Sequence, residues 1–140
     1  MKNKLNKYIY LFSLIALLAL TNLMVAQQAI SLYKDTSFFK SQRVTLTPYV
    51  AQDSRMAIIV CPGGSYHWLD IEGEGHEVGR WFQQQGISAF VLRYRVPGWM
   101  AWFTGYRYLF RGVRHPDMYN DGQRAMQYLH QHASDYGIGN

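Results

Sequence analysis

A glycine-containing loop, Pro62-Gly63-Gly64-Ser65-Tyr66, directly follows an uncharged apolar run over residues 56–61. Such a run is typical of a strand covered on both faces of an α/β sheet, and ligand sites in these sheets lie beyond the carboxyl ends of the strands. Two glycines let the backbone turn sharply and bring its N–H groups close to a ligand. N–H groups that converge on one point stabilise the oxyanion of an acyl-transfer intermediate, by roughly 10²–10³ in rate for each donor. The glycines alone fit a simple strand-ending turn equally well.

The side chains around this loop suggest other chemistries, and the sequence disfavours each of them. Ser65 is not surrounded by a G-x-S-x-G elbow, so a nucleophilic role for its hydroxyl is not indicated. Cys61 is the single cysteine and closes the apolar run, where a buried, inert thiol is expected. Histidines and acids follow the loop, but without the spacing of a catalytic zinc site; acids also suit the start of a helix. They are His67, Asp70, Glu72, Glu74, His76 and Glu77. We therefore expect no metal and no cofactor.

The order of apolar runs and glycines predicts the elements that hold this loop. Strands are expected over residues 30–33, 43–50, 56–61 and 87–94, and helices over 75–86 and 117–136. Strand, glycine turn, helix and strand in this order form a βαβ unit, which indicates an α/β sheet. In the first helix, Val78, Trp81 and Phe82 share the apolar face. In the second, Asp121 and Arg124 are expected to form a structural pair.

The first 26 residues read as a signal peptide rather than as part of the domain. Three lysines precede an apolar run over residues 8–20, and Val25-Ala26 supply small residues at a cleavage point. Residues 27–140 would then form a partial domain in a secreted or periplasmic protein, with no stable membrane association after cleavage. The alternative is a retained anchor, because residues 8–26 nearly reach the roughly 20 residues of a membrane span. Thr21 and Asn22 dilute that span and favour cleavage.

The charge of the chain does not indicate a nucleic-acid partner. The formal net charge is +5, but three of the lysines belong to the expected signal peptide. No nucleic-acid recognition motif accompanies the remaining surplus.

Several short motifs occur in a fixed order along the chain, at residues 44–49, 58–66, 72–75, 86–95, 114–116 and 121–125. Residues 58–66 are similar to the "VIVCPGGGY" block of exported α/β-hydrolases of the acetyl-xylan-esterase-like or lipase-like type, and the other motifs resemble the same family. The resemblance covers roughly residues 30–140. It implies the N-terminal part of a doubly wound, mostly parallel α/β-hydrolase sheet that ends before the nucleophile strand.

The resemblance also implies roles for the loop. Gly64 and Ser65 match the positions whose backbone N–H groups form the oxyanion hole, although many relatives have glycine at the position of Ser65. Tyr66, His67 and Trp68 would line the mouth of the substrate pocket.

The family's nucleophile elbow and its later Asp and His are not found within the 140 residues. The resemblance thus implies the N-terminal half of a secreted serine-type carboxylic-ester hydrolase. The whole hydrolase would act on acylated carbohydrate, as a small-molecule or polysaccharide ester, and the N-terminal half alone would be inactive. The run at 56–61 would be an open sheet edge in this polypeptide, because the nucleophile strand is its expected neighbour. The alternative is a non-catalytic remnant or a glycan-binding module that uses the aromatic segment 99–110.

Overall fold

The computed structural model describes residues 28–33, 43–65, 67–98 and 116–139. The strands are Ile30–Ser31 (β1), Thr45–Tyr49 (β2), Ala57–Val60 (β3) and Ser88–Arg93 (β4). The helices are Glu77–Gln84 (α2) and Asp117–Gln131 (α4), with a π-helical turn Ile71–His76 (η2) before α2 and a 3₁₀ turn Ala133–Tyr136 (η3) after α4. In this part of the chain no helix is long and apolar enough to cross a membrane. The expected signal peptide and the aromatic segment 99–110 lie outside the described residues.

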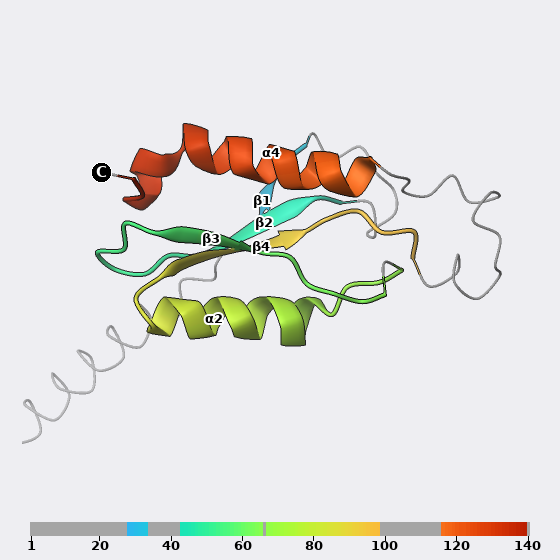
Figure 1. Ribbon diagram of the computed structural model, residues 1–140, viewed down its shortest axis with the longest axis horizontal. Coiled ribbons are helices and arrows are strands. Elements are labelled where there is room, and N and C mark those ends of the chain that lie inside the picture. The colour runs from blue at the N-terminus through green and yellow to red at the C-terminus, as the bar shows by residue number, and fades with distance from the viewer. Residues whose placement is uncertain (1–27, 34–42, 66, 99–115, 140) are drawn as a thin grey trace, which may run out of the picture.

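The strands form one mixed sheet in the order β1-β2-β4-β3. The β3–β4 pair is parallel, as the βαβ pattern predicts, whereas β2 is antiparallel to both β1 and β4. The two helices cover opposite faces of the sheet (Figure 1). The α/β class expected from the sequence is confirmed, although among the described strands the parallel pairing is confined to β3 and β4.

Strand β4 lies inside the sheet, and its alternating side chains enter two separate cores. Phe90 and Leu92 pack with Ala125 and Leu129 of α4. Ala89 and Val91 face the other way and pack with residues that include Phe82 of α2. Because successive side chains of a strand point to opposite faces, a strand covered on both faces needs the continuous apolar sequence found here.

Helix α2 approaches the sheet through glycine rather than through its bulkiest side chain. A Cβ atom on Gly79 would lie 2.7 Å from Tyr49 Cδ2 and 2.9 Å from Val91 Cγ2, so no larger residue fits there without a shift. Phe82 contacts the core as expected, but Trp81 is 55% exposed, and its expected place on the buried face is wrong. The buried residue of α2 is Gly79, and a pattern of hydrophobic residues does not detect a glycine.

Asp121 is fully buried in α4 and pairs with Arg95, two residues beyond β4, rather than with its helical neighbour. It accepts hydrogen bonds from the backbone N–H of Arg95 at 2.9 Å and from the Arg95 guanidinium, with Nη2 at 2.6 Å. The Arg124 guanidinium instead donates to the Leu32 carbonyl at 3.3 Å. The expected Asp121–Arg124 pair is therefore wrong, because the buried carboxylate ties α4 to the end of β4.

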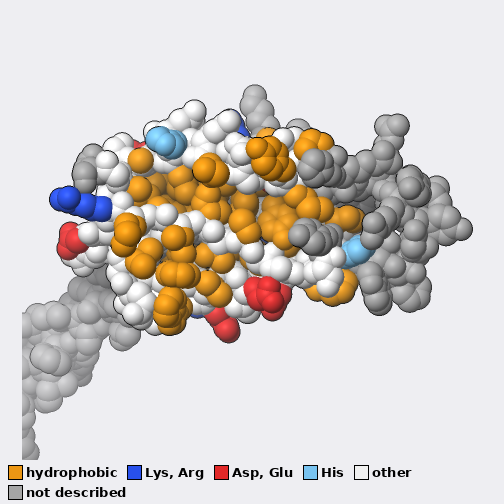
Figure 2. All heavy atoms as spheres, viewed as in Figure 1, with side chains coloured by type: hydrophobic (Ala, Val, Ile, Leu, Met, Phe, Trp, Pro, Cys, Tyr) orange, Lys and Arg blue, Asp and Glu red, His pale blue; other side chains and the backbone are white. Residues whose placement is uncertain are grey.

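Strand β3 is an edge of the described sheet, as the family resemblance implies for these residues. It pairs with β4 on one side, and all four of its residues are half-buried, whereas most of β4 is fully buried. A groove of about 600 Å³ runs beside it, with Ala57, Ile59, Met126 and Leu129 among its lining residues. Hydrophobic side chains gather between α4 and α2 on the face seen in Figure 2.

Candidate functional site

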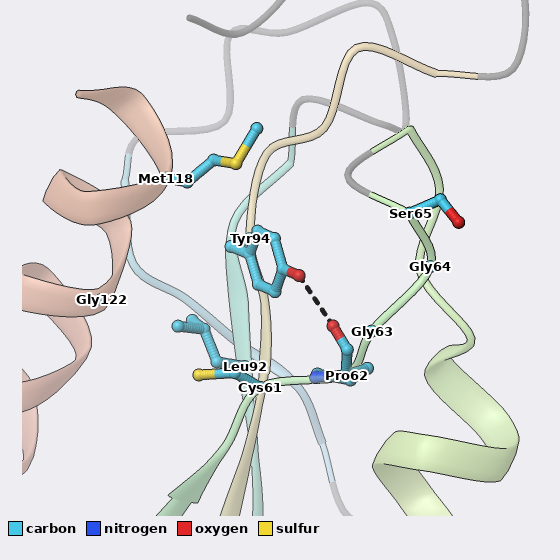
Figure 3. A pocket seen from close by; sticks show the side chains of 9 residues that line it. All are labelled: Cys61, Pro62, Gly63, Gly64, Ser65, Leu92, Tyr94, Met118 and Gly122. Atoms are coloured by element: carbon cyan, nitrogen blue, oxygen red, sulfur yellow. Dashed lines mark hydrogen bonds between the residues drawn. The ribbon is translucent and has the colours of Figure 1, made fainter. Parts of the chain in front are cut away.

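The loop of residues 61–65 leaves β3 at its carboxyl end and forms one wall of a cavity of about 470 Å³. The opposite wall comes from α4, through Met118 and Gly122, and Leu92 and Tyr94 contribute from β4 and the residue that follows it (Figure 3). A volume of this size is within the range of small-molecule sites, roughly 300–1,000 Å³. The loop therefore lies where the topology of an α/β sheet places a ligand.

The carbonyl groups of Gly63 and Gly64 accept hydrogen bonds from the segment that follows the loop. The Gly63 carbonyl accepts from the Asp70 N–H at 2.9 Å. The Gly64 carbonyl accepts from the N–H groups of His67 and Trp68, at 3.2 and 3.1 Å. In a planar trans peptide the N–H points opposite to the C=O, so the N–H groups of Gly64 and Ser65 both face away from residues 67–70. Within the described residues neither of these two N–H groups donates a hydrogen bond.

The backbone at Gly64 and Ser65 has positive φ angles. Gly64 has φ +140°, and a Cβ atom there would lie 2.0 Å from the Trp68 carbonyl oxygen, so only glycine fits. Ser65 has φ +55°, in the left-handed region that side chains other than glycine adopt at a cost of roughly 1–2 kcal/mol. The Ser65 side chain is exposed and points away from Tyr94 and Met118 in Figure 3.

The peptide unit between Pro62 and Gly63 is held at both ends by side chains. The Tyr94 hydroxyl donates to the Pro62 carbonyl at 2.7 Å, as drawn in Figure 3. The Gly63 N–H donates to Glu74 Oε2 at 2.8 Å. The sequence indicates no role in the loop for Tyr94 or Glu74, because acids in this stretch also suit the start of a helix. The proximity of Glu74 to a glycine eleven residues earlier depends on the path of the loop, which carries no local sequence signal.

The other expected site residues lie beside the loop or outside the described chain. His67 Nδ1 is 2.8 Å from the Ser65 carbonyl oxygen, so its ring lies against the turn. Trp68 is 43% exposed. Tyr66 is outside the described residues. Neither His67 nor Trp68 is among the residues that line the cavity.

Cys61 differs from the buried thiol that the apolar run predicted. It lies one residue beyond β3, is exposed, and contributes to the cavity wall. Neighbouring protein atoms desolvate its sulfur and raise the pKa of the thiol. A raised pKa disfavours the thiolate, which is the nucleophilic form.

A network of ionisable groups supports η2 and α2 behind the loop. Asp70 caps η2 by accepting from the Gly73 N–H at 3.1 Å. The Tyr49 hydroxyl lies 3.0 Å from His76 Nδ1, and burial lowers the pKa of His76. The hydrogen bond from Arg80 lowers the pKa of the exposed Glu72 carboxyl, which it meets at 2.9 Å.

The chemistry that this arrangement offers comes from the backbone. The N–H groups of Gly64 and Ser65 both face away from residues 67–70, have no acceptor among the described residues, and lie on a turn that forms a cavity wall. Such a pair can hold an anionic oxygen. Within the described residues no three His, Cys, Asp or Glu side chains are close enough together to hold a metal ion.

Comparison with known proteins places this fold among the hydrolases. No family model matches the chain. A segment of 58 residues is 40% identical to an acetylxylan esterase of Xylanibacter ruminicola, over 41% of this chain and 12% of that protein. The structure of an acetyl ester-xyloside bifunctional hydrolase from Caldicellulosiruptor lactoaceticus matches with a TM-score of 0.60 and 27% identity. An α/β-hydrolase from a Medee basin deep-sea metagenome library matches with a TM-score of 0.59 and 25% identity.

The structural matches cover most of this chain but a minor share of the relatives. The two structures cover 81% and 80% of the chain, which corresponds to 39% and 41% of their own lengths. A thermophilic esterase from Thermogutta terrifontis, with 22% identity and a TM-score of 0.58, shares the fold over 82% of this chain and 37% of its own. The chain thus has a part of the α/β-hydrolase fold, and it is similar to an acetylxylan esterase and to an acetyl ester-xyloside hydrolase over a part of their length.

Proposed function

We propose that this chain supplies the oxyanion-binding part of a secreted serine-type carboxylic-ester hydrolase that acts on acylated carbohydrate. The N–H groups of Gly64 and Ser65 carry the proposal. Both face away from residues 67–70, and neither has a protein acceptor in the described residues. Attack of a serine on the ester carbon turns the carbonyl oxygen into an oxyanion. Each N–H donor that meets it contributes roughly 2.7–4 kcal/mol to the transition state.

The nucleophile of this reaction comes from outside residues 1–140 in our proposal. The G-x-S-x-G elbow is not among these residues, and the Ser65 side chain points away from the Tyr94 side of the cavity (Figure 3). Tyr66, His67 and Trp68 are assigned to the mouth of the pocket, where an aromatic and an imidazole ring suit contact with a sugar. The choice of an acetylated carbohydrate rests on the similarity to an acetylxylan esterase and to an acetyl ester-xyloside hydrolase.

The test is ester hydrolysis by the product of the full reading frame that encodes this chain. We expect it to hydrolyse p-nitrophenyl acetate and to release acetate from acetylated xylan, whereas the polypeptide of residues 1–140 alone shows no turnover above buffer. A folded full product that binds xylan without turnover would refute the enzymatic proposal and favour a glycan-binding module. Turnover by residues 1–140 that disappears in Ser65→Ala would make Ser65 the nucleophile and overturn its role as a backbone donor.

Export is proposed from residues 1–26, whose lysines, apolar run and small residues follow the order of a signal peptide. The exported protein is then expected to begin near Gln27. N-terminal sequencing and intact mass of the secreted material test this. Protein that keeps residues 1–26 and sediments with membranes would contradict it.

A further inference from the structure

The peptide unit between Pro62 and Gly63 connects the loop to two different parts of the fold. Its carbonyl is bound by Tyr94, which follows β4 and whose ring packs against the α4-side core. Its N–H is bound by Glu74 of η2, on the chain that leads into α2. Because the C=O and N–H of a trans peptide point in opposite directions, bonds at both ends fix the tilt of the whole unit.

This tilt decides where the next N–H groups point. Gly63 and Gly64 have no side chains that restrain their dihedrals, and glycine populates more backbone conformations than any other residue. The bonds from residues 67–70 hold the Gly63 and Gly64 carbonyls, but these bonds come from the segment that the loop itself leads into. Tyr94 directly follows β4, and Glu74 lies in η2. Their hydrogen bonds therefore fix the position of the loop relative to the sheet and to the helix that covers it.

We propose that Glu74 and Tyr94 are positioning residues for the oxyanion donors, acting through the peptide unit between Pro62 and Gly63. This inference rests on the proposed function and adds to it two side chains that do not touch the substrate. Glu74 acts as a hydrogen-bond acceptor, and its charge is not required, because the amide oxygen of glutamine can accept the same N–H. A donor that is misplaced by about 1 Å lowers the rate by up to roughly 10²-fold.

The test measures kcat and KM for p-nitrophenyl acetate in the product of the full reading frame. Glu74→Ala and Tyr94→Phe are each expected to lower kcat by about tenfold, with KM changed less than about twofold, since the interaction they support forms in the transition state. Glu74→Gln is expected to restore kcat to within about threefold of the parent. Glu77→Ala is the matched control, because it removes the same charge from the neighbouring turn, and the Glu77 side chain has no hydrogen bond or ion pair in the described structure.

The double variant separates a shared action from two independent ones. If both side chains fix one peptide unit, Glu74→Ala combined with Tyr94→Phe lowers kcat by clearly less than the product of the two single effects. Multiplicative effects would overturn the proposal, as would a kcat for Glu74→Ala equal to that of Glu77→Ala. A loss in Glu74→Gln as large as in Glu74→Ala would also overturn it, because the acceptor oxygen is retained.

A second measurement is independent of catalysis. With selective ¹⁵N-glycine labelling, hydrogen exchange of the Gly63 N–H should rise at least about tenfold in Glu74→Ala and stay unchanged in Glu77→Ala, because the exchanging amide loses its acceptor. If exchange responds in this way while no variant hydrolyses any ester, the proposed function fails and the hold of Glu74 on the loop is upheld. If ester turnover is present and neither kcat nor exchange responds, the proposed function is upheld and the positioning role is refuted.

Discussion

Replacement of Gly64 by alanine tests the geometry of the loop most directly. The new Cβ would lie 2.0 Å from the Trp68 carbonyl oxygen, 2.6 Å from the Trp68 carbonyl carbon and 3.0 Å from the Leu69 Cα. All three atoms belong to the backbone, so no side-chain rotation relieves the contact. An ordinary contact begins at 3.4 Å, and the loop must therefore move by more than 1 Å.

The size of the expected effect follows from this displacement. A shift of about 1 Å in a positioned catalytic group reduces the rate by roughly 10²-fold, so kcat for p-nitrophenyl acetate should fall about 100-fold in Gly64→Ala. The φ of +140° is also a conformation that alanine adopts only with strain, which lowers the free energy of unfolding by about 1–3 kcal/mol. The two effects are measured separately, by steady-state kinetics and by urea unfolding of the full product.

Gly122 provides the matched control, because it lines the same cavity from α4 and nothing lies within 4 Å of an added Cβ. Alanine in the interior of a helix is preferred to glycine by about 1 kcal/mol, so Gly122→Ala should raise the free energy of unfolding by about that amount. Its kcat should stay within about threefold of the parent. The reasoning is refuted if Gly64→Ala keeps kcat within threefold, or if the two variants lose activity equally.

Four further outcomes are expected. Ser65→Gly should raise the free energy of unfolding by about 0.5–1 kcal/mol in urea titrations, because glycine relieves the left-handed strain, and a destabilised variant would contradict the observed φ of +55°. Asp121→Ala should lower the free energy of unfolding by about 3 kcal/mol, since the Arg95 guanidinium and N–H lose a fully buried acceptor. A loss below 1 kcal/mol would argue against the Asp121–Arg95 pairing. The polypeptide of residues 27–140 should self-associate in size-exclusion chromatography through the open edge of β3, and Met56→Lys should reduce this by placing a charge on that edge; a monomeric parent would contradict it. Burial lowers the pKa of His76, so its contribution to stability is complete above the unfolded pKa near 6.5 and is lost as pH falls towards the folded value. His76→Gln should therefore flatten the fall in the free energy of unfolding between pH 7 and 5. An unchanged slope would refute this expectation.

Sequence patterns predicted the elements of the sheet well and their order only partly. The runs at 56–61 and 87–94 are apolar without alternation, which indicates strands covered on both faces, and both strands are present. The βαβ pattern also gives the parallel β3–β4 pair. The antiparallel position of β2 beside β4 depends on contacts between segments about 40 residues apart, and no local pattern encodes such a pairing.

In the candidate site, too, the sequence predicts local features but not the contacts between distant segments. The glycines of the loop are visible in the sequence because a sharp turn at a strand end requires them, and Gly64 does have a positive φ. The contacts of Glu74 and Tyr94 with the loop are set by the path of the chain after β3 and β4, and any acid or tyrosine in those stretches looks alike in sequence. Asp121 likewise binds Arg95, which lies 26 positions away beyond the end of β4 and which helical spacing cannot identify.

The close approach of α2 to the sheet has a consequence for how this part of the chain folds. Each glycine in a helix lowers its intrinsic stability by about 1 kcal/mol relative to alanine, and the stretch from η2 through α2 contains three of them, Gly73, Gly75 and Gly79. A segment this short and this rich in glycine does not hold a helix in water by itself. We therefore expect its helical order to depend on the packing of Gly79 against Tyr49 and Val91. Helix formation and sheet formation are then expected to be coupled here, so that the hydrogen bond from the Gly63 N–H to Glu74 forms together with both.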